Sequence, residues 1–180
     1  MTQSLDRLAD MPTAEDLYLR LLEGVRTLIK DLPQEQVHLV GILSGGAWLA
    51  ERLQHDLKLP GAMGSLNISF YRDDFDRIGL HNQVTPSNIA FDVVDRHLIV
   101  VDDVLYTGRT IRAAMNELFD YGRPASVKLV VLIDRQERQL PICADFSAWQ
   151  TAEASTGSVV LAKTEQGTFS LHIEPETPDA

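Results

Sequence analysis

Two periodicities alternate along the chain, and together they predict alternating helices and strands. Between Thr13 and Pro33, apolar side chains recur every three or four positions, as on the buried face of a helix. The Thr13 hydroxyl would cap the first turn of this helix, and Pro33 would end it. The apolar positions are Leu17, Leu21, Val25 and Leu28.

Short apolar runs separate the helical segments. Such runs are typical of strands that are covered on both faces of a sheet, and they occupy residues 38–43, 98–101 and 127–133. Helical spacing follows the first run at residues 47–57 and the second at residues 110–121. Strands that alternate with helices predict a parallel sheet with right-handed crossovers. We therefore expect an α/β fold, a mostly parallel central sheet flanked by helices, in a single domain over residues 1–180.

Two further segments have the period of strands. Leu66, Ile68 and Phe70 alternate with polar residues, which predicts a half-buried strand. Near the C-terminus, residues 158–163 and 168–173 flank a glycine turn and predict a terminal hairpin.

A long polar segment, residues 72–90, has no sustained period and predicts a loop. It contains Gly, Pro, Asn and three acids, Asp73, Asp74 and Asp76. Loops of this length in compact domains are usually functional or disordered. The acids fit either an exposed acidic turn or a loop that closes over a ligand.

Composition narrows the class of protein. Of the 180 residues, 44% are hydrophobic and 23% are charged, which is the profile of a globular protein. The net charge of −10 disfavours broad nucleic-acid binding, which needs Lys and Arg against phosphates. Apolar runs are too short to cross a bilayer, the N-terminus does not resemble a secretion signal, and Cys143 has no cysteine to pair with. We expect a cytoplasmic protein that does not enter membranes.

The segment of most chemical interest follows the apolar run 98–101. Asp102 and Asp103 would lie at the carboxyl edge of the sheet, where ligands of open α/β folds bind. Carboxylates accept hydrogen bonds from the vicinal hydroxyls of a ribose. The next turn, residues 106–110, offers backbone N–H groups, two threonine hydroxyls and a helix N-terminus, which favour an anion. The sequence therefore predicts a ribose 5-phosphate site.

This segment resembles the phosphoribosyl diphosphate signature of type I phosphoribosyltransferases. The wider sequence is similar to the family of the bifunctional pyrimidine operon regulator and uracil phosphoribosyltransferase, most densely over residues 64–145. The matching motifs are Tyr71-Arg72-Asp73-Asp74, Phe91-Asp92, the run from Val101 to Thr110, Asp120-Tyr121-Gly122-Arg123-Pro124, Leu132-Ile133-Asp134-Arg135 and Leu140-Pro141-Ile142. The resemblance implies the type I phosphoribosyltransferase fold, with a small hood over the site.

The resemblance also implies roles for individual residues. The catalytic pair that holds the ribose hydroxyls would be Asp102 and Asp103. The cradle for the 5-phosphate would be Tyr106, Thr107, Gly108, Arg109 and Thr110. The start of the hood, which reads the pyrimidine largely through backbone groups, would be Ile133, Asp134 and Arg135. Arg72 and its loop would close over the diphosphate, which carries Mg²⁺. The family is typically dimeric, which implies a homodimer or higher homo-oligomer.

The first glycine turn departs from the family pattern. After Gly-Ile, the family usually has a basic residue, threonine, arginine and glycine, whereas this chain has Leu43, Ser44, Gly45 and Gly46. Backbone N–H groups of such a turn can bind a diphosphate, with Arg72 or Arg135 supplying charge. The plainer interpretation is a turn that only joins a strand to a helix.

The leading hypothesis is transfer of phosphoribosyl from 5-phosphoribosyl 1-diphosphate to uracil, which gives UMP and pyrophosphate, together with regulation of pyrimidine genes. The alternative is a UMP-sensing regulator with weak or no transferase activity, which the altered turn favours. A purine transferase is a third option. RNA binding is the weaker interpretation, because Arg20, Arg26 and Lys30 are interspersed with acids in the first helix.

Overall fold

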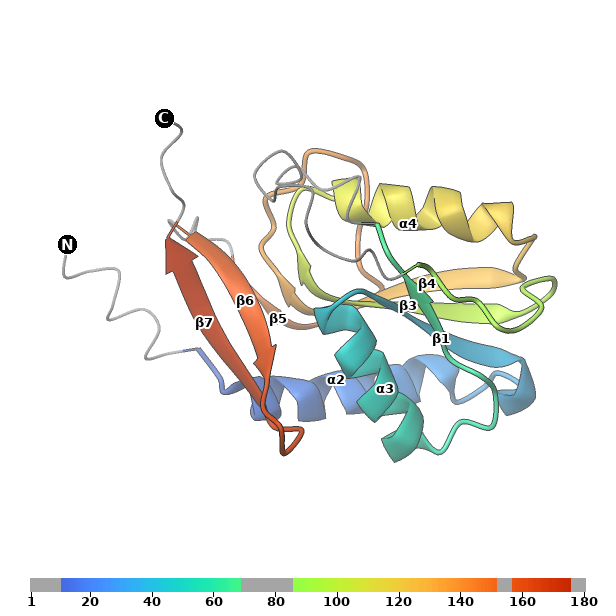
Figure 1. Ribbon diagram of the computed structural model, residues 1–180, viewed down its shortest axis with the longest axis horizontal. Helices are drawn as coiled ribbons and strands as arrows, with labels where there is room; N and C mark the ends of the chain where they lie inside the picture. The colour runs from blue at the N-terminus through green and yellow to red at the C-terminus, as the bar shows by residue number, and fades with distance from the viewer. Residues whose placement is uncertain (1–10, 69–85, 152–156, 176–180) are drawn as a thin grey trace.

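The computed structural model describes residues 11–68, 86–151 and 157–175. Its centre is a five-stranded parallel sheet with the strand order β2-β1-β3-β4-β5 (Figure 1). The strands are β1 (Val37–Ile42), β2 (Gly64–Leu66), β3 (His97–Leu105), β4 (Ser126–Asp134) and β5 (Phe146–Gln150). The strand order reverses direction between β1 and β3, and ligands of open α/β sheets bind at such a reversal.

Helices cover both faces of this sheet. In Figure 1, α2 (Ala14–Ile29) and α3 (Gly45–Leu57) lie below the sheet, and α4 (Arg109–Asp120) lies above it. Alternate residues of β3 belong to different cores: Ile99 and Val101 pack with α2 and α3, whereas Leu98 and Val100 pack with α4. The central strands are therefore apolar throughout, as the continuous runs in the sequence predict.

The helix ends follow local signals. Thr13 is the N-cap of α2, and its hydroxyl accepts a 3.1 Å hydrogen bond from the Asp16 N–H. The core side of α2 includes Leu17, Leu21 and Val25 as predicted. At the next turn Ile29, rather than the half-buried Leu28, is fully buried. A short 3-10 helix, Gln34–Gln36, leads into β1.

The C-terminal segment forms the predicted hairpin. Strands β6 (Gly157–Lys163) and β7 (Phe169–Pro175) pair antiparallel, and Gly167 in the turn has a positive φ of 83°. The hairpin buries Leu161 and Phe169 in the core that contains α2 and α3.

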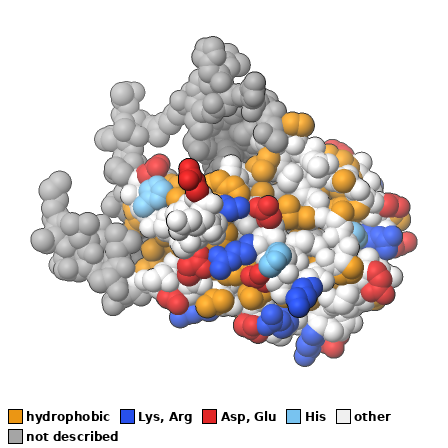
Figure 2. Space-filling view, turned by 60° about the horizontal axis from the view of Figure 1, so that its bottom comes forward, with side chains coloured by type: hydrophobic (Ala, Val, Ile, Leu, Met, Phe, Trp, Pro, Cys, Tyr) orange, Lys and Arg blue, Asp and Glu red, His pale blue; other side chains and the backbone are white. Residues whose placement is uncertain are grey.

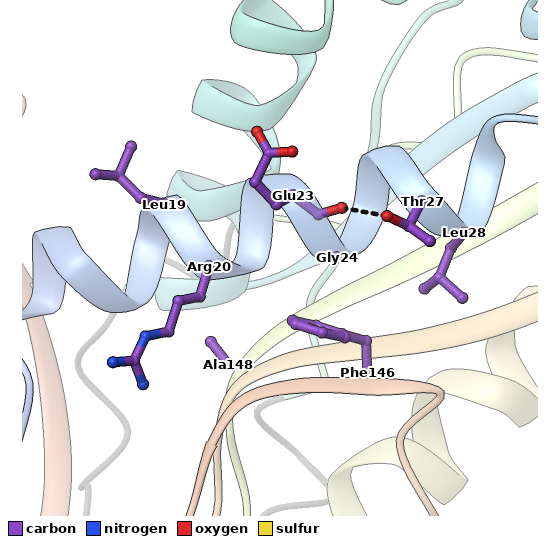
Figure 3. A pocket seen from close by; sticks show the side chains of 8 residues that line it. All are labelled: Leu19, Arg20, Glu23, Gly24, Thr27, Leu28, Phe146 and Ala148. Atoms are coloured by element: carbon purple, nitrogen blue, oxygen red, sulfur yellow. Dashed lines mark hydrogen bonds between the residues drawn. The ribbon is translucent and has the colours of Figure 1, made fainter.

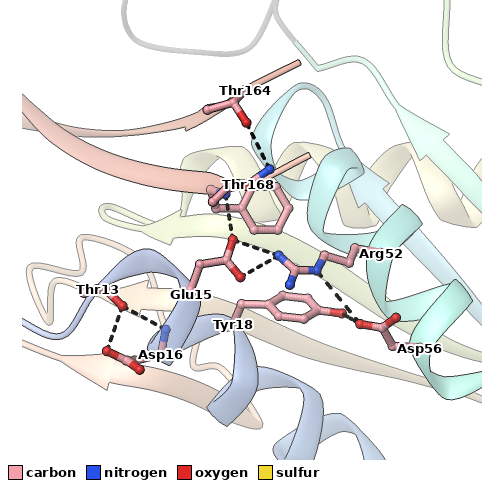
Figure 4. Close-up of polar contacts among 9 residues, drawn as sticks. Thr13, Glu15, Asp16, Tyr18, Arg52, Asp56, Thr164 and Thr168 are labelled. Carbon is pink, nitrogen blue, oxygen red and sulfur yellow. Dashed lines mark hydrogen bonds and ion pairs between the residues drawn. The ribbon is translucent and has the colours of Figure 1, made fainter. Parts of the chain in front are cut away.

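A cluster of polar groups fastens the hairpin to the two helices (Figure 4). Glu15 accepts a 2.7 Å hydrogen bond from the Phe169 N–H and forms a 2.8 Å ion pair with Arg52. The Arg52 guanidinium lies 4.0 Å from the centre of the Tyr18 ring, and the Tyr18 hydroxyl donates a 2.6 Å hydrogen bond to Asp56. The cluster therefore connects α2, α3 and β7.

Several boundaries differ from the sequence prediction. The strand predicted at residues 98–101 continues to Leu105, because the residues after Val101 still pair with β4. The helix predicted from Ala47 begins at Gly45. The alternating strand is only three residues long as β2, and Phe70 lies outside the described residues. Phe119, which has helical spacing, is 39% exposed at the end of α4.

Strand β5 was not predicted at all. It is five residues long, contains Ser147 and Gln150, and forms an edge of the sheet. An edge strand pairs on one side only and is not covered as a central strand is, so it lacks the continuous apolar run that marks β3 and β4.

Candidate functional site at the carboxyl edge of the sheet

The two neighbouring carboxylates lie within β3, just before its end. Asp102 is 5% exposed and Asp103 is half-buried. Each carboxylate accepts a hydrogen bond from the next backbone N–H: Asp103 N donates to Asp102 Oδ1 at 3.1 Å, and Val104 N donates to Asp103 Oδ1 at 3.0 Å. These bonds fix both side chains relative to the strand.

The first glycine turn packs directly against these carboxylates. A Cβ atom at Gly45 would lie 2.3 Å from Asp103 Oδ2, and one at Gly46 would lie 2.2 Å from the Val101 carbonyl oxygen. A side chain at residue 46 would therefore clash with the backbone, and one at residue 45 would require the Asp103 side chain to move. Leu43 is half-buried and Ser44 is exposed, and the peptide bond between them is cis. The structure thus brings together two segments that lie more than fifty residues apart in the sequence.

The second turn, residues 106–110, leads from β3 into α4. Gly108 is the N-cap of α4 and has a positive φ of 92°, a conformation that glycine adopts without strain. Thr107 is buried, and its hydroxyl accepts a 3.3 Å hydrogen bond from the Arg109 N–H. The N–H groups of the first turn of α4 point out of the helix, which is the arrangement that favours an anion.

The predicted start of the hood comprises the buried end of β4 and the first residue after it. Ile133 and Asp134 are almost fully buried, and the Asp134 carboxylate pairs with Arg138 and accepts a 2.9 Å hydrogen bond from the Gln136 N–H. A carboxylate that is paired in this way holds the backbone of the turn in place.

Arg135 supports the neighbouring turn instead of facing solvent. Its side chain is 4% exposed and forms a 2.9 Å ion pair with Glu137. Its guanidinium lies 4.0 Å from the centre of the Tyr106 ring and donates a 3.2 Å hydrogen bond to the Gly157 carbonyl. This side chain therefore joins the second turn to the start of β6, and it is not an exposed cation available to a diphosphate.

The segment after Arg135 runs alongside the second turn. The Thr107 carbonyl accepts hydrogen bonds from Gln139 N at 3.0 Å and Leu140 N at 3.3 Å. The Gln139 side-chain oxygen accepts two hydrogen bonds from the Arg109 guanidinium, from Nε at 3.3 Å and from Nη2 at 3.0 Å. The two glycine turns, the carboxylates and this segment thus surround one edge of the sheet.

Comparison with known proteins identifies the fold and the family of this arrangement. A phosphoribosyl transferase domain matches residues 5–161. The chain is 48% identical over 167 residues to the bifunctional protein PyrR of Ralstonia nicotianae, an alignment that covers 91% of this chain and 95% of that protein. It is 50% identical over 135 residues to the PyrR of Pseudomonas aeruginosa, covering 75% of this chain and 79% of that protein. The chain belongs to the PyrR family of phosphoribosyl transferases.

Solved structures support the fold more broadly. A hypoxanthine-guanine phosphoribosyltransferase from Bacillus anthracis superposes with a TM-score of 0.63 at 19% identity, covering 79% of this chain and 83% of that one. The enzyme from Leishmania tarentolae, in complex with GMP, has a TM-score of 0.59 at 20% identity and covers 79% and 80%. At these identities the likeness shows the fold alone. The expected type I phosphoribosyltransferase fold is confirmed.

In this PyrR family member, most of the predicted site residues converge on one edge. Those that the structure places together are Ser44, Gly45, Gly46, Asp102, Asp103, Tyr106, Thr107, Gly108, Arg109 and Thr110, with Ile133, Asp134 and Arg135 beside them. Arg72 and most of its predicted loop lie outside the described residues. Within the described ranges, no group of three or more His, Cys, Asp or Glu side chains is arranged to hold a metal ion.

Sequence reasoning missed Gln139. The residue is exposed, lies in an irregular segment and has no period or motif of its own, so nothing in the sequence connects it with Arg109 thirty positions earlier. The neighbouring motif Leu140-Pro141-Ile142 is the sequence signal that points to this segment.

A surface groove lies away from the carboxyl edge of the sheet. A groove of about 640 Å³ lies between the outer face of α2 and β5 (Figure 3). Its lining residues are Leu19, Arg20, Glu23, Gly24, Thr27, Leu28, Phe146 and Ala148, none of which is a predicted site residue. The Phe146 ring packs on Gly24 and forms part of the floor of the groove.

Among the helices of the described residues, none has the length and apolar character to span a membrane.

Proposed function

We propose that this protein transfers phosphoribosyl from 5-phosphoribosyl 1-diphosphate to uracil, giving UMP and pyrophosphate, and that it also regulates pyrimidine genes. Family membership supports the transfer reaction, and the name bifunctional protein, which the relatives carry, supports a second role. The observation that carries the proposal is the contact between Gly45 and Asp103, because it places an acidic pair between two turns that suit anions. A donor with a diphosphate at one end and a 5-phosphate at the other matches this order of groups.

The proposed mechanism relies on positioning and charge. Asp102 and Asp103 would accept hydrogen bonds from the ribose hydroxyls and would stabilise positive charge that develops on the ring as the bond from C1 to the diphosphate breaks. The turn of residues 106–110 would hold the 5-phosphate, and the backbone of the turn at Ser44 would hold the departing pyrophosphate. Backbone groups of residues 133–135 would present uracil N1 to C1, and the N1 proton would pass to solvent or to the released pyrophosphate as the N1–C1 bond forms. Fixing the reactants in this order removes much of the entropic barrier.

Mg²⁺ would accompany the donor instead of residing in the protein. Mg²⁺ retains several waters and is often held by one or two carboxylates together with substrate phosphates. Asp102 and Asp103 are the acidic side chains that could contribute one or two carboxylate ligands here. The ion would supply charge neutralisation for the diphosphate.

A UMP sensor without transferase activity is a weaker alternative. In the sequence, the altered first turn favours this sensor. However, the relatives that are 48% identical to this chain are named bifunctional proteins. In this backbone a side chain at residue 46 would clash with the Val101 carbonyl, and one at residue 45 would displace the Asp103 side chain. We therefore do not retain weak activity as an expectation for the native protein.

An RNA ligand for the regulatory role remains a proposal with little support from the surface. Figure 2 shows the face brought forward from the bottom of Figure 1, where α2 and α3 run, and Lys and Arg side chains there are interspersed with Asp and Glu. Glu23, for example, pairs with Arg26. The proposal also includes assembly of the protein into a homodimer or higher homo-oligomer and a location in the cytoplasm.

The proposal is tested by measuring pyrophosphate release from the donor with Mg²⁺ and each nucleobase in turn. We expect release with uracil and identification of UMP as the co-product. Release with hypoxanthine or guanine but not uracil would favour a purine transferase. Absence of release with every base, in a folded protein that binds UMP, would restore the sensor.

A further inference from the structure

Exposed apolar side chains gather where the end of α4 meets the loop before β3. The described residues contain five large apolar side chains that are exposed, and three of them are here: Val94 (46% exposed), Phe119 (39%) and Tyr121 (43%). Of the other two, Tyr106 belongs to the second turn of the site, and Leu19 lies on α2, on the opposite face of the sheet (Figure 1). We call Val94, Phe119 and Tyr121 the α4 patch.

Close contacts hold the parts of the α4 patch together. The Asp95 N–H donates a 3.1 Å hydrogen bond to the Arg123 carbonyl, and a Cβ at Gly122 would lie 3.1 Å from a methyl carbon of Val94. The Arg123 side chain donates a 3.1 Å hydrogen bond to the Phe119 carbonyl, and its Cζ lies 5.7 Å from the centre of the Phe119 ring. The patch is therefore preorganised, which reduces the entropy lost when a partner binds.

The chemistry of the α4 patch suits a protein partner. Aromatic side chains and arginine are enriched at the centres of protein interfaces, and the patch has two aromatic rings beside Arg123. Exposed acids adjoin it in the sequence, namely Asp92, Asp95 and Asp120. These acids would repel the phosphates of a nucleic acid, which needs an excess of Lys and Arg.

We propose that the α4 patch is the surface through which two copies of this chain associate. In an isologous dimer the same surface meets itself, so it must carry charges of both signs that complement each other. Arg123 on one copy and Asp95 and Asp120 on the other meet this requirement around an apolar centre. None of these three side chains has an ion pair within the part of the chain that the structure describes.

This inference rests on the assembly that the proposed function includes, and it names the surface responsible. The α4 patch lies at the C-terminal end of α4, whereas the second glycine turn leads into its N-terminal end. The 12 residues of α4 separate the two by about 18 Å. Association through the patch would therefore leave the carboxyl edge of the sheet open to substrates.

The test measures the mass of the full chain by sedimentation equilibrium over a concentration series. We expect the wild type to reach twice the mass of the chain. Phe119→Asp and Tyr121→Asp each place a charge in the apolar centre, and each should raise the dimer dissociation constant at least about thirtyfold, as for the loss of an interface hot spot. Circular dichroism shows whether each variant is folded.

A matched control is the remaining exposed apolar side chain outside the site. Leu19→Asp introduces the same charge at a position that is 55% exposed, and it should leave the dissociation constant unchanged. A second measurement uses the wild type alone. Hydroxyl-radical footprinting should show that Phe119 and Tyr121 become protected as the concentration rises through the dissociation constant, whereas Leu19 reacts equally throughout.

The outcomes separate this inference from the proposed function. A chain that stays monomeric at every concentration would overturn both the inference and the proposed assembly. A dimer that survives both patch variants, or that Leu19→Asp dissociates, would keep the assembly and remove the α4 patch from it. Unchanged footprints of Phe119 and Tyr121 during dimer formation would do the same. Pyrophosphate release with uracil tests the transfer reaction independently of these results.

Discussion

Gly45, at the start of α3, lies against the side chain of Asp103 in β3 so closely that a Cβ at residue 45 would be 2.3 Å from Asp103 Oδ2. The contact lies where the strand order reverses between β1 and β3. A side chain at residue 45 would therefore have to displace the Asp103 carboxylate. In this backbone the space beside Gly45 is already taken by the carboxylate.

The contact predicts that an arginine at residue 45 harms the site. From the sequence alone, Gly45→Arg should restore a basic residue and strengthen donor binding. The structure reverses that expectation, because the new side chain must displace Asp103 or the turn. Overpacking of this kind costs about 1–3 kcal/mol. We expect Gly45→Arg to reduce kcat/KM for the donor at least tenfold by the same scale. Unchanged or improved kcat/KM would show that the turn can move aside.

Leu43 provides the complementary test. Its side chain is half-buried and belongs to the same turn. We expect Leu43→Arg to tighten donor binding about two- to fivefold, the range for a solvent-accessible charge pair. UMP affinity should stay constant, because its phosphate would sit in the other turn. Equal tightening of UMP in calorimetry would contradict this division between the two turns.

The acidic pair is the second target. Asp102→Asn combined with Asp103→Asn replaces charged acceptors by neutral amides that cannot hold the ribose hydroxyls as strongly. Each charge-assisted hydrogen bond contributes about 1.5–3 kcal/mol, so we expect donor binding to fall below detection. Calorimetry on a double variant with a wild-type circular dichroism spectrum measures this directly. Unchanged donor affinity in that folded variant would remove the carboxylates from the site.

A stability prediction follows from the bond between Tyr18 and Asp56. Burial raises the pKa of Tyr18 far above its usual range, so its hydroxyl remains a donor. The pKa of Asp56 is lowered, first by the hydrogen bond from Tyr18 and then by that from His55. A lowered folded-state pKa gives stability that is present above the unfolded pKa and is lost as pH falls through the folded value.

Tyr18→Phe should therefore cost about 1 kcal/mol of unfolding free energy at neutral pH, because Asp56 loses a donor. The difference from the wild type should shrink in acid, as pH falls through the lowered folded-state pKa of Asp56 and its carboxylate becomes protonated. Urea denaturation at the two pH values measures this. A difference that stays constant with pH would show that Asp56 does not mediate the effect.

Much of the site could be predicted from the sequence because it depends on local order. The run into Asp102 and Asp103 and the turn to Thr110 are contiguous, so strand, carboxylates and helix start can be placed without tertiary information. Contacts between distant segments could not be predicted in this way. Neither the approach of Gly45 to Asp103 nor the burial of Arg135 under Tyr106 has a sequence pattern, since both depend on how the sheet brings segments together.

RNA binding is open to a separate test. The net charge of −10 and the interspersed charges predict weak binding that disappears as salt rises, because such binding depends on released counterions. Filter binding with a pyrimidine-operon leader RNA across a salt series measures the slope. A tight, sequence-specific complex at physiological salt would overturn this prediction and favour RNA as the regulatory ligand.

The central claim, a site for phosphoribosyl transfer to uracil, is tested most directly by competition among bases. The wild-type protein is given limiting 5-phosphoribosyl 1-diphosphate, Mg²⁺ and equal concentrations of uracil, cytosine, hypoxanthine and guanine, and the nucleotides are identified by mass spectrometry. Product ratios then report the ratios of kcat/KM. The account predicts UMP as the dominant product, and its loss in the double variant of Asp102 and Asp103. Dominance of a purine nucleotide, or UMP formation that persists in that double variant, would contradict it.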